Sequence, residues 1–225
     1  MKKNVEKILQ YVQKPARYAG GELNSVQKDL NKVSLRYAFC FPDLYEIGMS
    51  HLGMKILYSL VNDKENYWCE RVFAPDTDME EQMRKNNVPL VALESGDYIK
   101  DFDIIGFTLM YELSYTNVLN MLDLAQIPLK SSDRTDLTPI ICCGGPCACN
   151  PEPITDFVDI VFLGDGEEST IELLDLLDDC KKKGLSKHDF LMKAKDIKGV
   201  YVPSFYEDSY NEDGTLKELK PLYGA

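Results

Sequence analysis

Three shortages narrow what this 225-residue chain can be. No apolar run approaches the roughly 18–20 residues that a membrane-spanning helix needs, and no apolar signal core follows the charged N-terminus. Basic residues are outnumbered, with 25 Lys and Arg against 37 Asp and Glu, which gives a net charge of −12. Such a charge disfavours contact with a nucleic-acid backbone. We therefore expect a cytoplasmic protein that binds neither membranes nor nucleic acids directly.

Histidine and phosphate-binding motifs are also scarce. The chain has only two histidines, His51 and His188, and neither lies in a pattern typical of nucleophilic catalysis. No phosphate loop with a lysine is present, and Gly164 and Gly166 are not followed by the third glycine of a dinucleotide fingerprint. The acidic residues of the segment 165–168 would repel phosphate. These observations disfavour a dinucleotide site and hydrolytic catalysis.

Cysteine is present in an odd number, seven, and four of the seven cysteines crowd into residues 142–149. In a reducing cytosol these would be thiols rather than disulfides. Cys143 and Cys147 have the first interval of a C-x3-C-x2-C cluster motif, but Cys149 comes one residue too early to complete it. We therefore interpret this group as strand and loop thiols in preference to a metal site.

Strand-like and helix-like segments alternate along the chain. Tyr37 and Phe39 alternate with the small residues Ala38 and Cys40, and the run 103–110 is apolar on both faces, as a covered parallel strand should be. We predict strands at 32–41, 67–73, 89–93, 103–110, 139–143 and 159–163, and helices at 5–12, 52–61, 76–85, 114–125, 167–183 and 186–194. This alternation predicts an α/β fold, a three-layer doubly wound parallel sheet of the flavodoxin and Rossmann type.

Three parts follow from this pattern. Residues 1–30 are expected to form a helical and loop extension, residues 31–200 the α/β domain, and residues 201–225 a polar linker without a packing pattern of its own. Glycine-containing loops follow several of the predicted strands, at 43–53, 144–146 and 164–168. Because the carboxyl ends of parallel strands meet at one edge, we expect a ligand site there.

Residues in these loops resemble a known family. Asp43, Tyr45 and Gly48 resemble the cobalamin-binding loop D-x-H-x-x-G, with Tyr45 in place of the histidine. Thr108 lies where that family has an S-x-L motif, and residues 144–145 lie where it has a glycine pair. The order and spacing of residues 144–167 resemble the B12-binding-like domains that precede a radical SAM barrel, and the likeness covers nearly the whole chain.

The resemblance implies the N-terminal part of a longer radical SAM enzyme of unknown substrate. Such an enzyme uses a 4Fe-4S cluster and S-adenosylmethionine, both expected in a C-terminal domain that would be the chain's partner. This chain would hold cobalamin against the barrel, as a methyl carrier or redox partner, and would be inactive alone. By resemblance, the cofactor-binding residues are Asp43, Tyr45, Gly48, Thr108, Glu112, Ser114, Gly144 and Gly145.

Tyr45 leaves alternatives open, because a phenol with a pKa of about 10 is a poor neutral ligand for cobalt. Cobalamin would then bind without a protein ligand, since His51 is expected in the first turn of a helix, where capping or packing is its usual role. A degenerate domain that only covers the barrel is the first alternative. A flavodoxin-like module for flavin mononucleotide is the second, and the acidic loops disfavour it.

Overall fold

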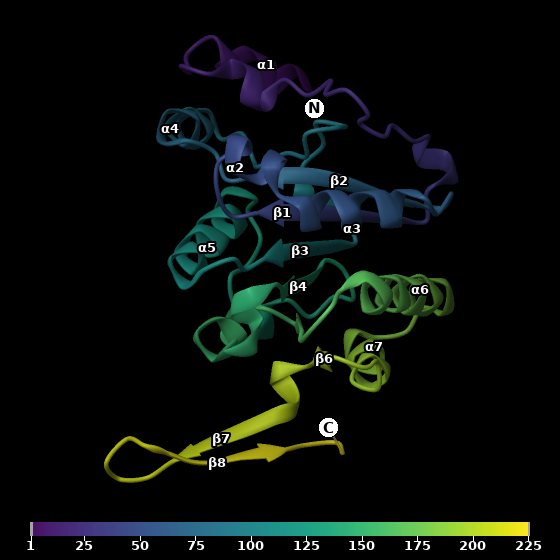
Figure 1. Ribbon diagram of the computed structural model, residues 1–225, viewed down its shortest axis with the longest axis vertical. Helices are drawn as coiled ribbons and strands as arrows, with labels where there is room; N and C mark the ends of the chain where they lie inside the picture. Colours follow the sequence, from purple (N-terminus) through teal and green to yellow (C-terminus); the bar gives the residue numbers. More distant parts are fainter. Residues whose placement is uncertain (1, 225) are drawn as a thin grey trace.

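Six strands form one sheet in the order β2-β1-β3-β4-β5-β6 in the computed structural model, which describes residues 2–224 (Figure 1). The first five strands run parallel, and β6 pairs antiparallel with β5. The strands are β1 (Leu35–Phe41), β2 (Tyr67–Phe73), β3 (Ile104–Thr108), β4 (Ile140–Gly144), β5 (Ile160–Phe162) and β6 (Val200–Tyr201). The order reverses between β1 and β3, so their carboxyl ends form the switch point where such sheets bind ligands.

Helices cover both faces of this sheet. One face carries α1 (Lys2–Leu9), α4 (Thr77–Asn86) and α5 (Tyr115–Leu124), and the other carries α3 (Leu52–Asn62), α6 (Glu167–Lys183) and α7 (Lys187–Ala194). The alternation along β1 explains both layers, since Ala38 and Cys40 pack in one core while Tyr37 and Phe39 pack in the other. The predicted three-layer α/β fold is confirmed.

Shorter helical turns connect these elements. They are α2 (Tyr45–Ser50) and the 3-10 turns η1 (Pro15–Tyr18), η2 (Leu30–Lys32), η3 (Ile99–Asp101), η4 (Glu112–Ser114), η5 (Ser131–Asp133), η6 (Pro146–Cys149), η7 (Glu152–Phe157) and η8 (Pro203–Phe205). None of the helices within residues 2–224 combines the length and apolarity needed to cross a membrane.

The strand predicted at 89–93 was wrong. Three of its backbone N–H groups donate to three different segments, from Leu90 to the Leu124 carbonyl, from Ala92 to that of Asp97 and from Leu93 to that of Arg71. The segment therefore has only an isolated bridge and joins no ladder. Leu90, Ala92 and Leu93 are buried and Val91 is half-buried, but periodicity and burial alone do not fix hydrogen-bond partners.

The tail, for which we expected no packing pattern of its own, contains regular structure. Residues Tyr206–Tyr210 (β7) and Leu216–Pro221 (β8) form an antiparallel hairpin that lies beyond the β6 edge of the sheet (Figure 1). Asp213 and Gly214 supply the turn, with φ of +82° at Gly214, and such Asp-Gly pairs are a strong hairpin signal. That this tail leads to a further domain stays a prediction.

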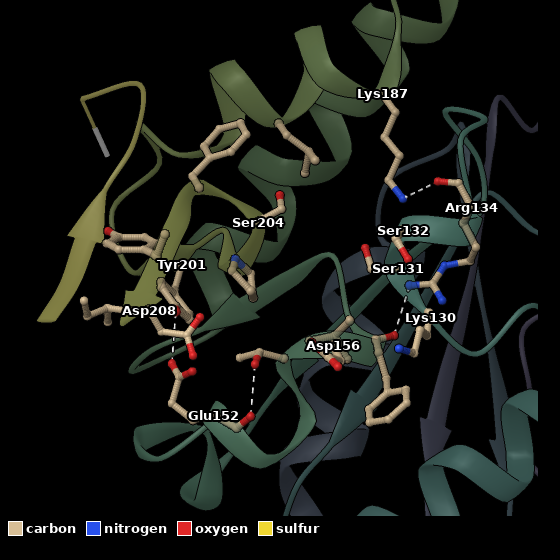
Figure 2. Close-up of a pocket in the computed structure, with 18 of the residues that line it drawn as sticks. Lys130, Ser131, Ser132, Arg134, Glu152, Asp156, Lys187, Tyr201, Ser204 and Asp208 are labelled. Carbon is tan, nitrogen blue, oxygen red and sulfur yellow. Dashed lines mark hydrogen bonds between the residues drawn. The ribbon is translucent and has the colours of Figure 1, made fainter. Parts of the chain in front are cut away.

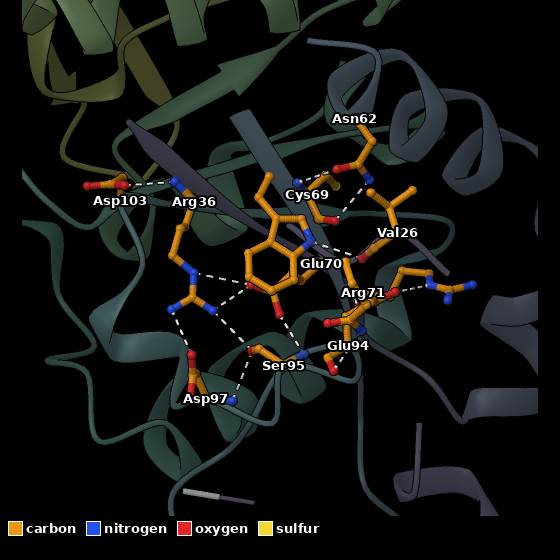
Figure 3. A network of polar contacts seen from close by, with 12 residues as sticks. Val26, Arg36, Asn62, Cys69, Glu70, Arg71, Glu94, Ser95, Asp97 and Asp103 are labelled. Carbon is orange, nitrogen blue, oxygen red and sulfur yellow. Dashed lines mark hydrogen bonds and ion pairs between the residues drawn. The ribbon is translucent and has the colours of Figure 1, made fainter. Parts of the chain in front are cut away.

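Three ion pairs link the arginines of β1 and β2 to carboxylates of β2 and of the following loop (Figure 3). Arg36 contacts the fully buried Glu70 and also Asp97, and Arg71 donates to the buried Glu94 with Nε 2.6 Å from Oε1. Burial raises the pKa of Glu70, while the neighbouring Arg36 opposes that rise. These pairs hold β1 and β2 against the loop that contains Glu94.

Candidate ligand cavity at the carboxyl edge of the sheet

A cavity of about 540 Å³ lies between the sheet and helices α3 and α6, at the carboxyl ends of the strands. Its walls come from β1, β3, β4 and β5 and from the first turns of the two helices. Its lining includes Tyr37, Phe39, His51, Leu57, Thr108, Gly144, Gly145, Phe162, Asp165, Gly166, Glu167 and Thr170.

Small residues in the middle of the sheet explain the hollow. On the face toward α3 and α6, β3 presents Gly106 and Thr108, and β4 ends at Gly144. The strands on either side present large rings on this face, Tyr37 on β1 and Phe162 on β5. Because side chains alternate along a strand, three small residues between two large ones leave a trough that the helices roof over.

Tyr37 forms the floor of the trough and lies over β3. A Cβ on Gly106 would lie 2.2 Å from the Tyr37 hydroxyl, so only glycine permits this placement. The Tyr37 side chain is 4% exposed, and its hydroxyl has no hydrogen-bond partner among residues 2–224. Burial raises the pKa of Tyr37 well above its usual value, so the hydroxyl is a neutral donor and acceptor. The hydroxyl opens onto the cavity, so its hydrogen-bonding capacity is available to a bound group.

His51 lines the cavity as the N-cap of α3. Its Nδ1 accepts from the Met54 backbone N–H at 3.1 Å, which assigns the ring proton to Nε2. Burial lowers the pKa of His51, so the ring is neutral. A metal on Nε2 would require a proton on Nδ1 and would break the cap. His51 is therefore placed to donate a hydrogen bond, and the cap opposes metal ligation.

The charge at the rim is negative. Asp165 and Glu167 line the cavity, while none of the residues described around it is Lys or Arg. Neither carboxylate makes a hydrogen bond or ion pair with another residue in the described range 2–224. Helix α6 begins here with Gly166 as its N-cap, so its first N–H groups have no side-chain cap. The site thus offers neutral donors inside and free carboxylates outside.

Three of the eight residues expected at the site line the cavity: Thr108, Gly144 and Gly145. Gly145 has φ of +107°, and a Cβ there would lie 2.9 Å from the Leu109 carbonyl oxygen, so the turn after β4 requires glycine. Gly48 instead permits packing, because a Cβ would lie 2.4 Å from the Phe73 ring.

The other four expected residues lie outside the cavity wall. Tyr45 packs edge-on against Phe73 with ring centroids 5.3 Å apart, and its hydroxyl donates to Glu22 Oε1 at 3.3 Å. Burial, then the charge of Glu22, raises the pKa of Tyr45. Asp43 accepts from the Tyr111 hydroxyl at 3.1 Å, which joins the loops after β1 and β3 across the switch point.

Glu112 and Ser114 belong to the short turn η4, before α5. Ser114 is 1% exposed, and its hydroxyl donates to the Tyr111 carbonyl at 2.7 Å, so its observed contact is local. Glu112 is exposed. Their roles in cofactor binding stay predictions.

The cysteines do not converge. Cys142 and Cys143 are buried on opposite faces of β4, whereas Cys149 is exposed with its Sγ 3.2 Å from the Pro146 carbonyl oxygen. Burial raises the pKa of Cys143 to about 12, which keeps it a thiol. Within residues 2–224, no three His, Cys, Asp or Glu side chains are grouped to hold a metal ion.

A second cavity of about 820 Å³ lies between the body of the domain and the hairpin (Figure 2). Arg134 and Lys187 lie on one side, and Glu152 and Asp208 lie on the other. Both basic side chains are already paired with a carboxylate. Lys187 and Arg134 contact the buried Asp159, with N–O distances of 2.7 and 3.2 Å. This wall is therefore a structural brace of the β5 end.

Comparison with known proteins identifies the family of this chain. The chain is 27% identical over 180 residues to the uncharacterized protein MJ0966 of Methanocaldococcus jannaschii, which is 80% of this chain and 34% of that protein. The chain thus spans about a third of the length of this relative. No solved structure matches the chain. Residues 53–203, more than half of the chain, match the family of N-terminal domains of radical SAM proteins. The chain therefore belongs to the family of radical SAM protein N-terminal domains.

Proposed function

We propose that the carboxyl edge of this sheet faces the radical SAM domain of a longer enzyme and that the cavity holds a ligand at that contact. The observation that carries the proposal is a set of exposed large apolar side chains, the apolar edge residues, in the segments that follow β1, β3 and β5. It consists of Ile47, Leu52, Tyr111, Leu113 and Leu163, which are 43–81% exposed. Large apolar side chains that stay exposed at one edge favour an interaction site there.

In the proposed enzyme, a 4Fe-4S cluster and S-adenosylmethionine in the radical SAM domain supply the radical chemistry. The residues of this chain would position the ligand. Tyr37 and His51 would present hydrogen-bonding groups to the ligand, Phe39 and Phe162 would form apolar walls, and the apolar edge residues would exclude water from the contact.

Amide hydrogen exchange tests the proposed contact without a known substrate. In the full-length enzyme, amides of 109–114 are expected to exchange more slowly than in the 225-residue chain. Leu113→Asp should lower that protection about tenfold or more, because burying a leucine contributes about 1.5–3 kcal/mol. Leu30→Asp is the matched control, since Leu30 is 52% exposed and precedes β1 at the opposite edge. Equal exchange in the two proteins would contradict the proposal.

Cobalamin, which the resemblance implies, fits this edge only in part. Thr108 and Gly144 border room for a flat ring system. Tyr45 lies outside the cavity wall with its hydroxyl on Glu22, and His51 uses Nδ1 as a cap. No Lys or Arg among the described lining residues would neutralise the phosphodiester of the cofactor's tail. The residues present do not fit a protein-ligated cobalt, which favours a domain that covers the barrel without ligating cobalamin.

Titration with hydroxocobalamin tests that conclusion. We expect the cobalt-sensitive visible bands to stay unchanged when the chain or the full-length enzyme is added, because the Tyr45 hydroxyl bonds to Glu22 and the cap at His51 Nδ1 keeps the ring proton on Nε2. Tyr45→Phe and His51→Asn serve as ligand-deficient references. A band shift with the natural sequence that either variant abolishes would establish cobalt ligation and overturn the conclusion.

A further inference from the structure

We propose that the cavity above Tyr37 binds an uncharged heteroaromatic base or nucleoside and rejects its phosphate ester. This deepens the proposed function, on which it rests for the ligand's place at the interface. The proposal depends on three features of the described residues: a cavity-facing tyrosine hydroxyl without a protein partner, aromatic walls and an unpaired acidic rim.

The free hydroxyl is the feature that points to a ligand. Tyr37 is buried among apolar residues, yet its hydroxyl makes no hydrogen bond within residues 2–224. Other buried tyrosines of this chain are paired: the Tyr58 hydroxyl accepts from the Val26 N–H at 2.7 Å, and the Tyr67 hydroxyl donates to Asp175 at 2.6 Å. A ring nitrogen or an exocyclic group of a base would complete the missing bond of Tyr37.

The shape and lining suit a flat ring. The Tyr37 and Phe39 rings stack with centroids 5.6 Å apart on one side, and Phe162 forms the other side of the trough. Leu57 of α3 and Thr170 of α6 form the roof. Aromatic walls favour stacked or edge-on contact with a heteroaromatic ring. The trough is therefore a slot whose deepest polar group is the Tyr37 hydroxyl.

The rim sets the charge of the ligand. Asp165 and Glu167 are exposed and unpaired among the described residues, and no basic side chain lines the cavity. A phosphate entering between them would meet two carboxylates without a counter-charge. The uncapped N–H groups at the start of α6 remain available to neutral acceptors such as ribose or carbonyl oxygens. An uncharged ligand meets no such repulsion.

Isothermal titration calorimetry with matched probes tests the ligand class. Adenosine and benzimidazole are the uncharged probes, and AMP carries the phosphate, each titrated into the 225-residue chain and into the full-length enzyme. We expect an uncharged probe to bind and AMP to bind at least about tenfold more weakly than adenosine. Asp165→Asn with Glu167→Gln should narrow that difference. Binding of neither uncharged probe, or equal binding of AMP, would overturn the proposal.

Two variants locate the site. Tyr37→Phe should weaken binding of the uncharged probe about fivefold, the usual effect of one hydrogen bond, without lowering the melting temperature. Tyr67→Phe is the control, because its hydroxyl lies outside the cavity: it should lower the melting temperature and leave binding unchanged. Leu57→Trp should fill the slot and abolish binding. Unchanged affinity in both Tyr37→Phe and Leu57→Trp would contradict this location.

The two proposals fail separately. Exchange protection of residues 109–114 measures contact with the radical SAM domain and needs no small molecule. Calorimetry on the 225-residue chain measures ligand class and needs no second domain. Protection without binding of an uncharged probe would overturn the ligand class alone, and binding without protection would overturn the docking proposal alone.

Discussion

Asp159→Ala is expected to lower the free energy of unfolding by about 3–5 kcal/mol, because it removes one partner from a buried ion pair. Asp159 is 2% exposed, and one of its oxygens contacts both Lys187 and Arg134. The other oxygen accepts from the Ile141 N–H at 2.8 Å, and the Ser131 hydroxyl also donates to this carboxylate. Two buried cations would lose the one carboxylate that each contacts within residues 2–224.

The effect would spread beyond β5 because the partners lie on separate elements. Arg134 also donates to the carbonyls of Pro128 and Leu129, at 2.8 and 2.7 Å, and Lys187 donates to the Arg134 carbonyl at 2.8 Å. The carboxylate therefore ties the loop before β4 to β5 and to α7. We expect faster amide exchange in all three elements when it is removed.

Urea unfolding followed by circular dichroism measures this effect. Asp156→Ala is the matched control, because Asp156 is exposed three residues away and makes no hydrogen bond or ion pair within residues 2–224. It should change stability by less than about 0.5 kcal/mol. Asp159→Asn keeps the shape and loses the charge, so an intermediate loss is expected. A loss below about 1 kcal/mol for Asp159→Ala would show that the two cations find other partners.

The layers of the fold were predictable because residues that alternate along a strand pack on opposite faces of the sheet, and this alternation can be read in the sequence. Tyr37 and Phe39 alternate with Ala38 and Cys40, and the two sets do pack on opposite faces. The segment 89–93 has equally apolar residues, yet it forms no strand because its N–H groups bond to three separate segments. The hairpin at Asp213 and Gly214 had a recognisable turn signal that the polar composition of its strands obscured.

The cavity was predictable only in part. The positions of Thr108 and of residues 144–145 at the ends of adjacent strands indicated the correct edge. Tyr37 gave no separate signal, because a core tyrosine and a cavity floor look alike in sequence. Its relation to Gly106 depends on strand register, in which Phe39 pairs with Gly106. Tyr45 lies outside the cavity wall, where it packs on Phe73.

Gly106→Ala is expected to destabilise the protein by about 1–3 kcal/mol through overpacking and to displace the floor of the cavity. The new Cβ would lie 2.2 Å from the Tyr37 hydroxyl and 2.7 and 2.8 Å from two of its ring carbons. The ring is 4% exposed and packed between strands and helices, so it has little freedom to move aside. Gly166→Ala is the control, since its nearest neighbour would be 3.6 Å away, an ordinary contact.

A double-mutant cycle separates this clash from any general intolerance of a side chain on β3. Tyr37→Leu alone should be destabilising because it removes buried ring atoms, but in the Gly106→Ala background it should cost about 1–2 kcal/mol less, since the shorter side chain relieves the overlap. Urea unfolding of the four proteins gives the coupling, and probe calorimetry should show that Gly106→Ala also loses binding. Additive effects would mean that the alanine is accommodated without moving Tyr37, and the account of Gly106 as the residue that makes room for the cavity floor would then be wrong.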